Sequence, residues 1–208
     1  MTPVPIFHSN DMDEAQRFVS SHPFAVLAVN GASGPMSALV PLIIEPGSEK
    51  LLGHVARQNS FWSAAQATKL GAIAVFNGPE SYVSPSNYPS KQEHGRVVPT
   101  WNYMAVQISG AIQVETDASK MHPYFSGLSD QMEAGRETPW GVADAPKDYI
   151  DKLSRGIVGI SIKIEEISFV KKLSQEKKRD DKMGVYNAFQ KSSSDKQIQL
   201  AAEMKRYI

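Results

Sequence analysis

Alternating apolar and polar positions in the first half of the chain predict short strands joined by tight turns. Two turns carry the glycine, asparagine or proline residues that such connections need: Asn30-Gly31-Ala32-Ser33-Gly34 and Glu45-Pro46-Gly47-Ser48. Consecutive hairpins favour an antiparallel sheet or barrel over alternating βα units. The strands expected here are Phe24 to Val29, Pro35 to Ile44, Lys50 to Val55, Leu70 to Phe76 and a short one at Tyr82-Val83.

Two longer strands are expected in the second half. Between Trp101 and Val114, two sets of residues alternate, as they do on the two faces of a strand. One set is Tyr103, Ala105, Gln107 and Ser109, and the other is Met104, Val106, Ile108 and Gly110. Gly156 to Ile167 is rich in isoleucine and predicts a final strong strand. Pro85 to Val98 and the charge run Lys171 to Lys182 are both interpreted as loops, the second of them mobile.

Helices are expected between and after the strands. Asn10 or Asp11 can cap a short first helix, which His22-Pro23 ends. Asn59 or Ser60 can cap a second helix that runs to Thr68. We therefore predict one domain over residues 1–208, mainly β with inserted helices (α+β), with a helical insertion at about 116–154 and a C-terminal helix at about 192–207.

Composition narrows the class of protein. The 208 residues carry 22 basic and 22 acidic side chains, so no overall field attracts nucleic acid or an anionic membrane. The absence of cysteine excludes disulfides and thiolate chemistry and suits a cytoplasmic protein. The N-terminus lacks the pattern of a signal peptide, and no apolar run approaches the roughly 20 residues of a membrane span.

Polar, donor-rich side chains follow the third strand. Arg57, Asn59 and Ser60 lie on the turn from that strand into the second helix. A helix N-terminus beside an arginine can bind phosphate, because free N–H groups and a fork of donors converge there. The alternative is ordinary capping by Asn59 beside a solvated arginine, and this segment alone favours that alternative.

Aromatic and amide side chains begin the long strand at Thr100-Trp101-Asn102-Tyr103. They can stack on a planar ring and bind its edge, or Trp101 can be an ordinary core residue. Lys172 and Gln175 follow the last strand and can donate to a ring carbonyl or a phosphate, or form a solvated end.

Catalytic and metal motifs are missing from the sequence. The five histidines are dispersed, and no pair has metal-ligand spacing with a carboxylate. His54 alone lies within a strand near the candidate site, where it is either a structural residue or a ligand contact. We therefore assign no metal ligand and no catalytic residue.

Taken together, these segments resemble the PaiB family of FMN-binding negative transcriptional regulators. The matching motifs keep one order along residues 24–185, which makes the resemblance specific. They are Gly53-His54-Val55-Ala56-Arg57, Asn59, Trp62, Phe76, Gly78-Pro79, Tyr82, Ser84-Pro85, Pro99-Thr100-Trp101-Asn102-Tyr103, Val106, Gly110, Gly156-Ile157-Val158-Gly159, Lys172-Leu173-Ser174-Gln175 and Gly184-Val185.

The resemblance implies an antiparallel split β-barrel of the FMN-binding type, working as a homodimer with the flavin at the subunit interface. It implies that Arg57, Asn59 and Ser60 face the phosphate and that Ser37 and Leu39 run along the isoalloxazine, with His54 close by. It also implies that Trp101 and Asn102, next to Thr100, close the site, in some members from the partner subunit, and that Lys172 and Gln175 near the end of the chain add further contacts with the cofactor.

This sequence departs from the family pattern mainly at the ring end of the implied site. Ala38-Leu39 replaces a Thr-His pair, Asn87 an aromatic residue, Gln107 a histidine and Glu176 an asparagine. Three functions stay open: an FMN-binding regulator that acts through a partner protein, a flavin-dependent oxidoreductase that uses NAD(P)H or oxygen, and a repressor that binds DNA itself. The neutral charge argues against the last.

Overall fold

The computed structural model describes residues 4–68 and 70–208. Its seven strands pair in the order β1-β7-β4-β3-β2-β5-β6, and β7 also pairs with β6, so the sheet closes on itself. The strands are β1 (His8–Ser9), β2 (Phe24–Gly31), β3 (Gly34–Ile44), β4 (Lys50–Ala56), β5 (Ala72–Val83), β6 (Thr100–Glu115) and β7 (Ile157–Lys172).

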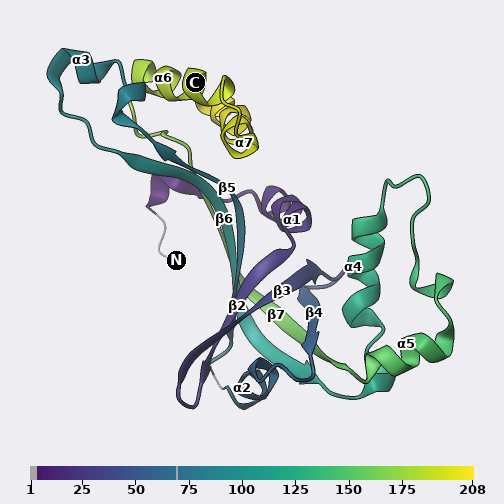
Figure 1. Cartoon of the computed structure of the whole chain (residues 1–208). Helices are drawn as coiled ribbons and strands as arrows, with labels where there is room; N and C mark the ends of the chain where they lie inside the picture. The colour runs from purple at the N-terminus through teal and green to yellow at the C-terminus, as the bar shows by residue number, and fades with distance from the viewer. Residues whose placement is uncertain (1–3, 69) are drawn as a thin grey trace. The chain divides into compact units, whose positions relative to one another are not determined.

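The helices are inserted between these strands or follow them (Figure 1). The α-helices are α1 (Met12–Ser21), α2 (Phe61–Ala67), α3 (Ser90–His94), α4 (Pro123–Glu133), α5 (Lys147–Ser154), α6 (Arg179–Gln190) and α7 (Asp195–Met204). Short 3-10 turns are η1 (Pro5–Phe7), η2 (Pro85–Asn87), η3 (Ala118–Lys120), η4 (Val142–Asp144) and η5 (Lys205–Tyr207). No helix in the described ranges is both long and apolar enough to cross a membrane.

The chain divides into two compact units. Of the described residues, the first comprises 4–11, 77–106 and 168–208, and the second comprises 12–68, 70–76 and 107–167. Strands β5, β6 and β7 continue from one unit into the other. The prediction of one domain over the whole chain stays a prediction, and each unit is described by itself below.

The second unit holds the hairpin strands β2, β3 and β4. The β2–β3 hairpin has a two-residue loop, Ala32-Ser33, between Gly31 and Gly34, which are opposite each other. Gly34 has φ +128°, a conformation that L side chains rarely adopt, so this position favours glycine. The largest side chains buried inside this unit are Leu27, Leu42, Leu51, Phe61, Phe76, Ile108, Met121, Ile160 and Ile162. Each contributes about 1.5–3 kcal/mol through burial of apolar surface.

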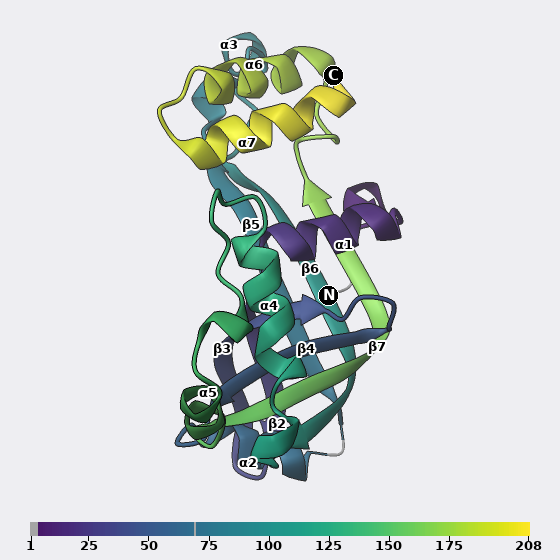
Figure 2. The same cartoon turned by 90° about the vertical axis from the view of Figure 1, so that its right-hand side faces the viewer.

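Helices cover part of the sheet in this unit. Helix α1 packs on β3, α2 packs on β2 and β3, and α4 packs on β3 and β4 (Figure 2). A Cβ added at Gly159 would lie 2.8 Å from the Tyr124 ring, so the start of α4 sits directly on the β7 backbone. Both α4 and α5 fall within the range 116–154 that the sequence marks as helical.

The first unit is built around α6 and α7, which pack side by side (Figure 1). A Cβ added at Gly184 of α6 would overlap the carbonyl oxygen of Asn87, so glycine is needed for the contact between α6 and η2. Asp181 in the first turn of α6 accepts hydrogen bonds from the Ser90 amide (3.1 Å) and hydroxyl (2.8 Å) and so caps α3.

Three sequence expectations in these regions are wrong. Tyr82-Val83 is the end of the long strand β5, which continues through Gly78-Pro79. The polar segment Pro85 to Val98 contains η2 and α3. The charge run Lys171 to Lys182 holds the end of β7 and the first turn of α6, because Asp181 is buried against Ser90.

Candidate functional site

Arg57 directly follows β4 in the second unit, and its hydrogen bonds connect this position with the end of β6 and the start of β7. Its amide donates to the Gly156 carbonyl (2.8 Å) and its Nε to the Arg155 carbonyl (2.8 Å). Its Nη2 donates to the carbonyls of Thr116 (2.9 Å) and Ile157 (3.0 Å). The guanidinium is therefore held in one orientation by neutral acceptors at the end of β6 and the start of β7.

These carbonyls do not neutralise the positive charge of the Arg57 guanidinium. Within residues 4–68 and 70–208, Arg57 has no carboxylate partner, and its Nη1 has no hydrogen-bond acceptor. A half-buried cation without a counter-ion favours an anion more strongly than an exposed one does. The β4–α2 turn therefore presents an oriented cation, and its predicted contact with a phosphate stays a prediction.

Asn59 acts as the cap of α2, which was the alternative interpretation. Its Oδ1 accepts a hydrogen bond from the Phe61 amide (2.9 Å), while Ser60 at the N-cap position makes no side-chain capping bond. Trp62 Nε1 donates back to the Arg57 carbonyl (2.8 Å) and fixes the turn. The exposed Ser60 hydroxyl and the Nδ2 of Asn59 stay available for a ligand.

His54 lies on β4 beneath the start of α4. Its Nδ1 donates to the Tyr124 carbonyl (3.0 Å), which fixes the tautomer, and Phe125 packs edge-on against its ring. Burial raises the pKa of Tyr124, and a hydrogen bond with Ser161 acts in the opposite direction. These contacts give His54 a structural role in holding α4, and its predicted role near the flavin stays a prediction.

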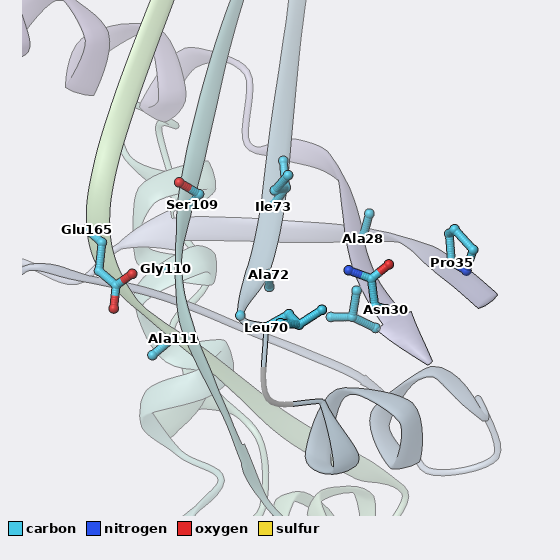
Figure 3. A pocket seen from close by; sticks show the side chains of 12 residues that line it. Ala28, Asn30, Pro35, Leu70, Ala72, Ile73, Ser109, Gly110, Ala111 and Glu165 are labelled. Atoms are coloured by element: carbon cyan, nitrogen blue, oxygen red, sulfur yellow. The ribbon is translucent and has the colours of Figure 1, made fainter. Parts of the chain in front are cut away.

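Ser37 and Leu39 lie on the outer face of β3, away from the core. They are opposite Ala28 and Val26 of β2, and Ala28 is in turn opposite Ile73 of β5. Leu39 is 65% exposed. This outer face of β3, β2 and β5 is mostly apolar, and Phe24 (61%) and Ile73 (42%) on it are exposed as well. Ala28 and Ile73 of this face also line the pocket shown in Figure 3.

The first unit holds the other predicted residues. Lys172 Nζ donates to Thr100 Oγ1 and to the Trp101 carbonyl (2.7 Å), and burial lowers its pKa. Trp101 is 53% exposed, and its ring packs edge-on against that of Tyr82 with ring centroids 6.2 Å apart. Tyr82 (48% exposed) belongs to this aromatic pair and is a further candidate site residue that was not among those predicted from the sequence.

Asn102 and Gln175 bind protein groups in this unit. Asn102 is fully buried and hydrogen-bonded to Ser174 (3.0 Å from Nδ2 to Oγ). The Gln175 Oε1 accepts from the Leu173 amide (2.6 Å), and its Nε2 donates to the Lys171 carbonyl. Their predicted contacts with the cofactor stay predictions.

The closed strand order and the inserted helices define an antiparallel split barrel, as predicted. Two solved structures share the fold at 13% sequence identity. A flavocytochrome, Anf3, of Azotobacter vinelandii has a TM-score of 0.56 over 79% of this chain and 69% of its own. An FAD and heme binding protein of Mycobacterium smegmatis has a TM-score of 0.57 over 79% and 73%.

A family model described as "Putative FMN-binding domain" matches residues 1–166. The chain therefore belongs to this FMN-binding domain family, which confirms the predicted cofactor at the level of the family. Protease synthase and sporulation protein PAI 2 of Bacillus subtilis is 29% identical over 203 residues, covering 95% of this chain and 93% of the relative. This confirms the PaiB resemblance. An uncharacterized protein of Aspergillus fumigatus is 30% identical over 91% of both chains.

Proposed function

We propose that the chain is a cytoplasmic FMN-binding homodimer that regulates transcription negatively through a partner protein. The observation that supports FMN binding is the state of the Arg57 guanidinium. Three backbone carbonyls hold it, and it has no carboxylate partner in the described ranges. Such a group is already oriented before a phosphate arrives, so little side-chain entropy is lost when the anion binds.

The donor set at the β4–α2 turn fits the phosphate of FMN. Arg57 Nη1, the Ser60 hydroxyl and Asn59 Nδ2 are all donors, and they belong to one turn. When bound, FMN supplies one- and two-electron redox chemistry. The chain's own residues would bind the phosphate at this turn, and the outer face of β3 at Ser37 and Leu39 would lie along the ring.

The homodimer is supported by the outer face of β3, β2 and β5. Phe24 (61% exposed), Leu39 and Ile73 leave large apolar side chains on neighbouring strands uncovered in one chain. Contiguous exposed apolar surface of this kind marks protein–protein interfaces. A second copy that covers the same face would bury these side chains isologously.

Light scattering tests the homodimer. The expected mass is twice that of the chain, whose own mass is 22.8 kDa. Leu39→Asp should give monomers, because it would place an unpaired carboxylate in the interface. Ile198→Asp on α7 alters another exposed apolar residue (44%), which does not belong to this face, and should leave the dimer intact. Monomeric wild-type protein would contradict the proposal.

Two observations support a role in negative regulation of transcription through a partner protein: the name of the relative PAI 2 and the neutral net charge of this chain. The name of PAI 2 connects that protein with protease synthesis and sporulation, which suits a regulator. With 22 basic and 22 acidic side chains, this chain has no overall field for DNA, which favours action through a protein. A salt-sensitive gel shift with purified protein alone would support direct DNA binding instead.

A flavin-dependent oxidoreductase is the second candidate. The fold is shared with a flavocytochrome and with an FAD and heme binding protein, whose cofactors carry electrons. NAD(P)H oxidation that rises on addition of FMN, and that is lost in Arg57→Ala, would favour this activity over regulation.

A further inference from the structure

The segment between β6 and β7 forms a helical insertion, residues 116–156, which contains η3, α4, η4 and α5. It leaves the sheet directly after β6 and returns directly before β7. Figure 2 shows α4 and α5 next to the strands of the second unit. Among the described residues of these two helices, only Ser154 is buried. Because so little of α4 and α5 is buried, the insertion should detach from the sheet at a lower free-energy cost than the strands separate.

Arg57 binds both ends of this insertion. Its Nη2 donates to the Thr116 carbonyl at the start (2.9 Å). At the end, its Nε donates to the Arg155 carbonyl (2.8 Å), its Nη2 to the Ile157 carbonyl (3.0 Å) and its amide to the Gly156 carbonyl (2.8 Å). A single residue on the β4–α2 turn therefore connects the two ends of a long segment.

The helices of the insertion depend on Arg57 to different degrees. Helix α5 packs on η3, and the carbonyls of Arg155 and Thr116 that Arg57 binds lie within two residues of these elements. Helix α4 has an attachment of its own, because the Tyr124 carbonyl accepts a hydrogen bond from His54 (3.0 Å). The contacts of Arg57 should therefore matter most for α5 and η3.

We propose that a phosphate bound at Arg57 stabilises the attachment of α5 and η3, so that occupancy of the flavin site controls the order of the insertion. This inference rests on the proposed FMN site at the β4–α2 turn. When the insertion detaches, the guanidinium loses its carbonyl acceptors and its fixed orientation. The phosphate then meets a mobile side chain and binds more weakly, because the group is no longer oriented in advance.

A ligand that binds one of two states more tightly shifts the protein toward that state. FMN would therefore favour the attached insertion, and an insertion that is loosened would in turn weaken FMN binding. In a regulator that acts through a partner protein, this coupling would make the surface formed by α5 depend on whether FMN is bound.

Hydrogen–deuterium exchange of the full chain, followed by mass spectrometry, tests the coupling. Saturating FMN should slow amide exchange in α5 and η3 about tenfold and in α4 less, while α7 of the other unit should not change. Riboflavin, which lacks the phosphate, should leave exchange in α5 unchanged. FMN that protects the β4–α2 turn but not α5 would overturn the inference and keep the proposed FMN site. Absence of any FMN binding would overturn both.

The ligand-free protein tests the role of Arg57 separately. Arg57→Ala should speed exchange in α5 and η3 about tenfold, because the hydrogen bonds of its side chain to both ends of the insertion are lost. Arg17→Ala removes an exposed charge on α1 and is the control. Exchange of α5 at the wild-type rate in Arg57→Ala would contradict the proposal, whether or not FMN binds.

A proline in α5 tests the coupling in the opposite direction. Lys152→Pro should disrupt α5 and weaken FMN binding about fivefold or more, with riboflavin binding unchanged. Lys147→Pro removes the same charge from the same helix, but at its first position, where proline is tolerated, so FMN affinity should be kept. Both lysines are exposed. Faster exchange of α5 in Lys152→Pro together with wild-type FMN affinity would exclude the coupling.

Discussion

The buried side chains of Asn102 and Ser174 are hydrogen-bonded to each other, with Nδ2 to Oγ at 3.0 Å and Oγ to Oδ1 at 3.1 Å. Asn102 lies near the start of β6, and Ser174 follows β7 with φ +65°, an unusual conformation for a residue with a side chain. This pair joins two motifs that are more than 70 residues apart in the chain.

Asn102→Ala should therefore destabilise the protein. The variant would leave the buried Ser174 hydroxyl without its amide partner, at a cost of about 1–3 kcal/mol in the free energy of unfolding. Chemical denaturation measures the change. Asn187→Ala on α6 alters an exposed asparagine and serves as the control, with an expected change within about 0.5 kcal/mol. Equal stability of the two variants would contradict the role of the pair.

Arg57→Ala should weaken FMN binding by about 1.5–3 kcal/mol, the range for a hydrogen bond to a charged group. Arg57→Lys should recover part of this loss, because it keeps the charge but has a single nitrogen in place of the Nε and Nη2 donors that bind the carbonyls of Arg155, Thr116 and Ile157. Arg17→Ala on α1 removes an exposed charge elsewhere and should leave the affinity unchanged. Fluorescence titration with FMN measures all three, and wild-type affinity in Arg57→Ala would remove this residue from the site.

Gly159→Ala should loosen the attachment of α4. The new methyl group would meet the Tyr124 ring at 2.8 Å, and overpacking of this kind costs about 1–3 kcal/mol. Gly141→Ala in the same insertion is the control, since its nearest neighbour would be 3.9 Å away. Adding Tyr124→Ala to Gly159→Ala should relieve the clash, so the second change should cost less than it does in wild type. A simple sum of the two effects in thermal unfolding would exclude this contact.

The titration of Tyr88 should make the stability of the folded protein depend on pH. Burial, aided by the charges of Glu176 and Asp181, raises the pKa of Tyr88 to about 12 from 10.0, and its buried hydroxyl has no hydrogen-bond partner in the described structure. The neutral side chain is thus favoured in the folded state, so its contribution is complete below pH 10 and is lost as the pH rises toward about 12.

Tyr88→Phe removes this titration. Between pH 10 and 12 wild type should lose about 2 kcal/mol more stability than the variant does. At pH 7 the variant should be at least as stable as wild type, because no hydrogen bond is lost. Denaturant unfolding at both pH values measures the difference, with the exposed Tyr149→Phe as control. Parallel pH profiles for wild type and Tyr88→Phe would disprove the assignment.

Much of the strand pattern could be predicted from the sequence. The hairpin strands alternate apolar and polar residues and end at glycine or proline turns, and β2, β3 and β4 lie where these signals indicate. Strand β5 was interrupted in the prediction because Gly78-Pro79 usually ends a strand, whereas here it continues the long strand.

The partners of the site residues could not be predicted in the same way. The sequence shows Arg57 beside a helix start, but the carbonyls that hold it come from Thr116, Arg155 and Ile157, and only the folded sheet brings these together. Glu165 and Leu70 line one pocket for the same reason. Local sequence patterns predict the helices and strands, whereas contacts between distant strands depend on the register of the strands and on closure of the sheet.

Titration of the purified full chain with FMN tests the central claim most directly. The account predicts saturable binding of one FMN per chain, with flavin fluorescence that changes on binding and with affinity lost in Arg57→Ala but kept in Arg17→Ala. Wild-type protein that leaves the fluorescence of added FMN unchanged and does not retain the flavin on gel filtration would contradict it.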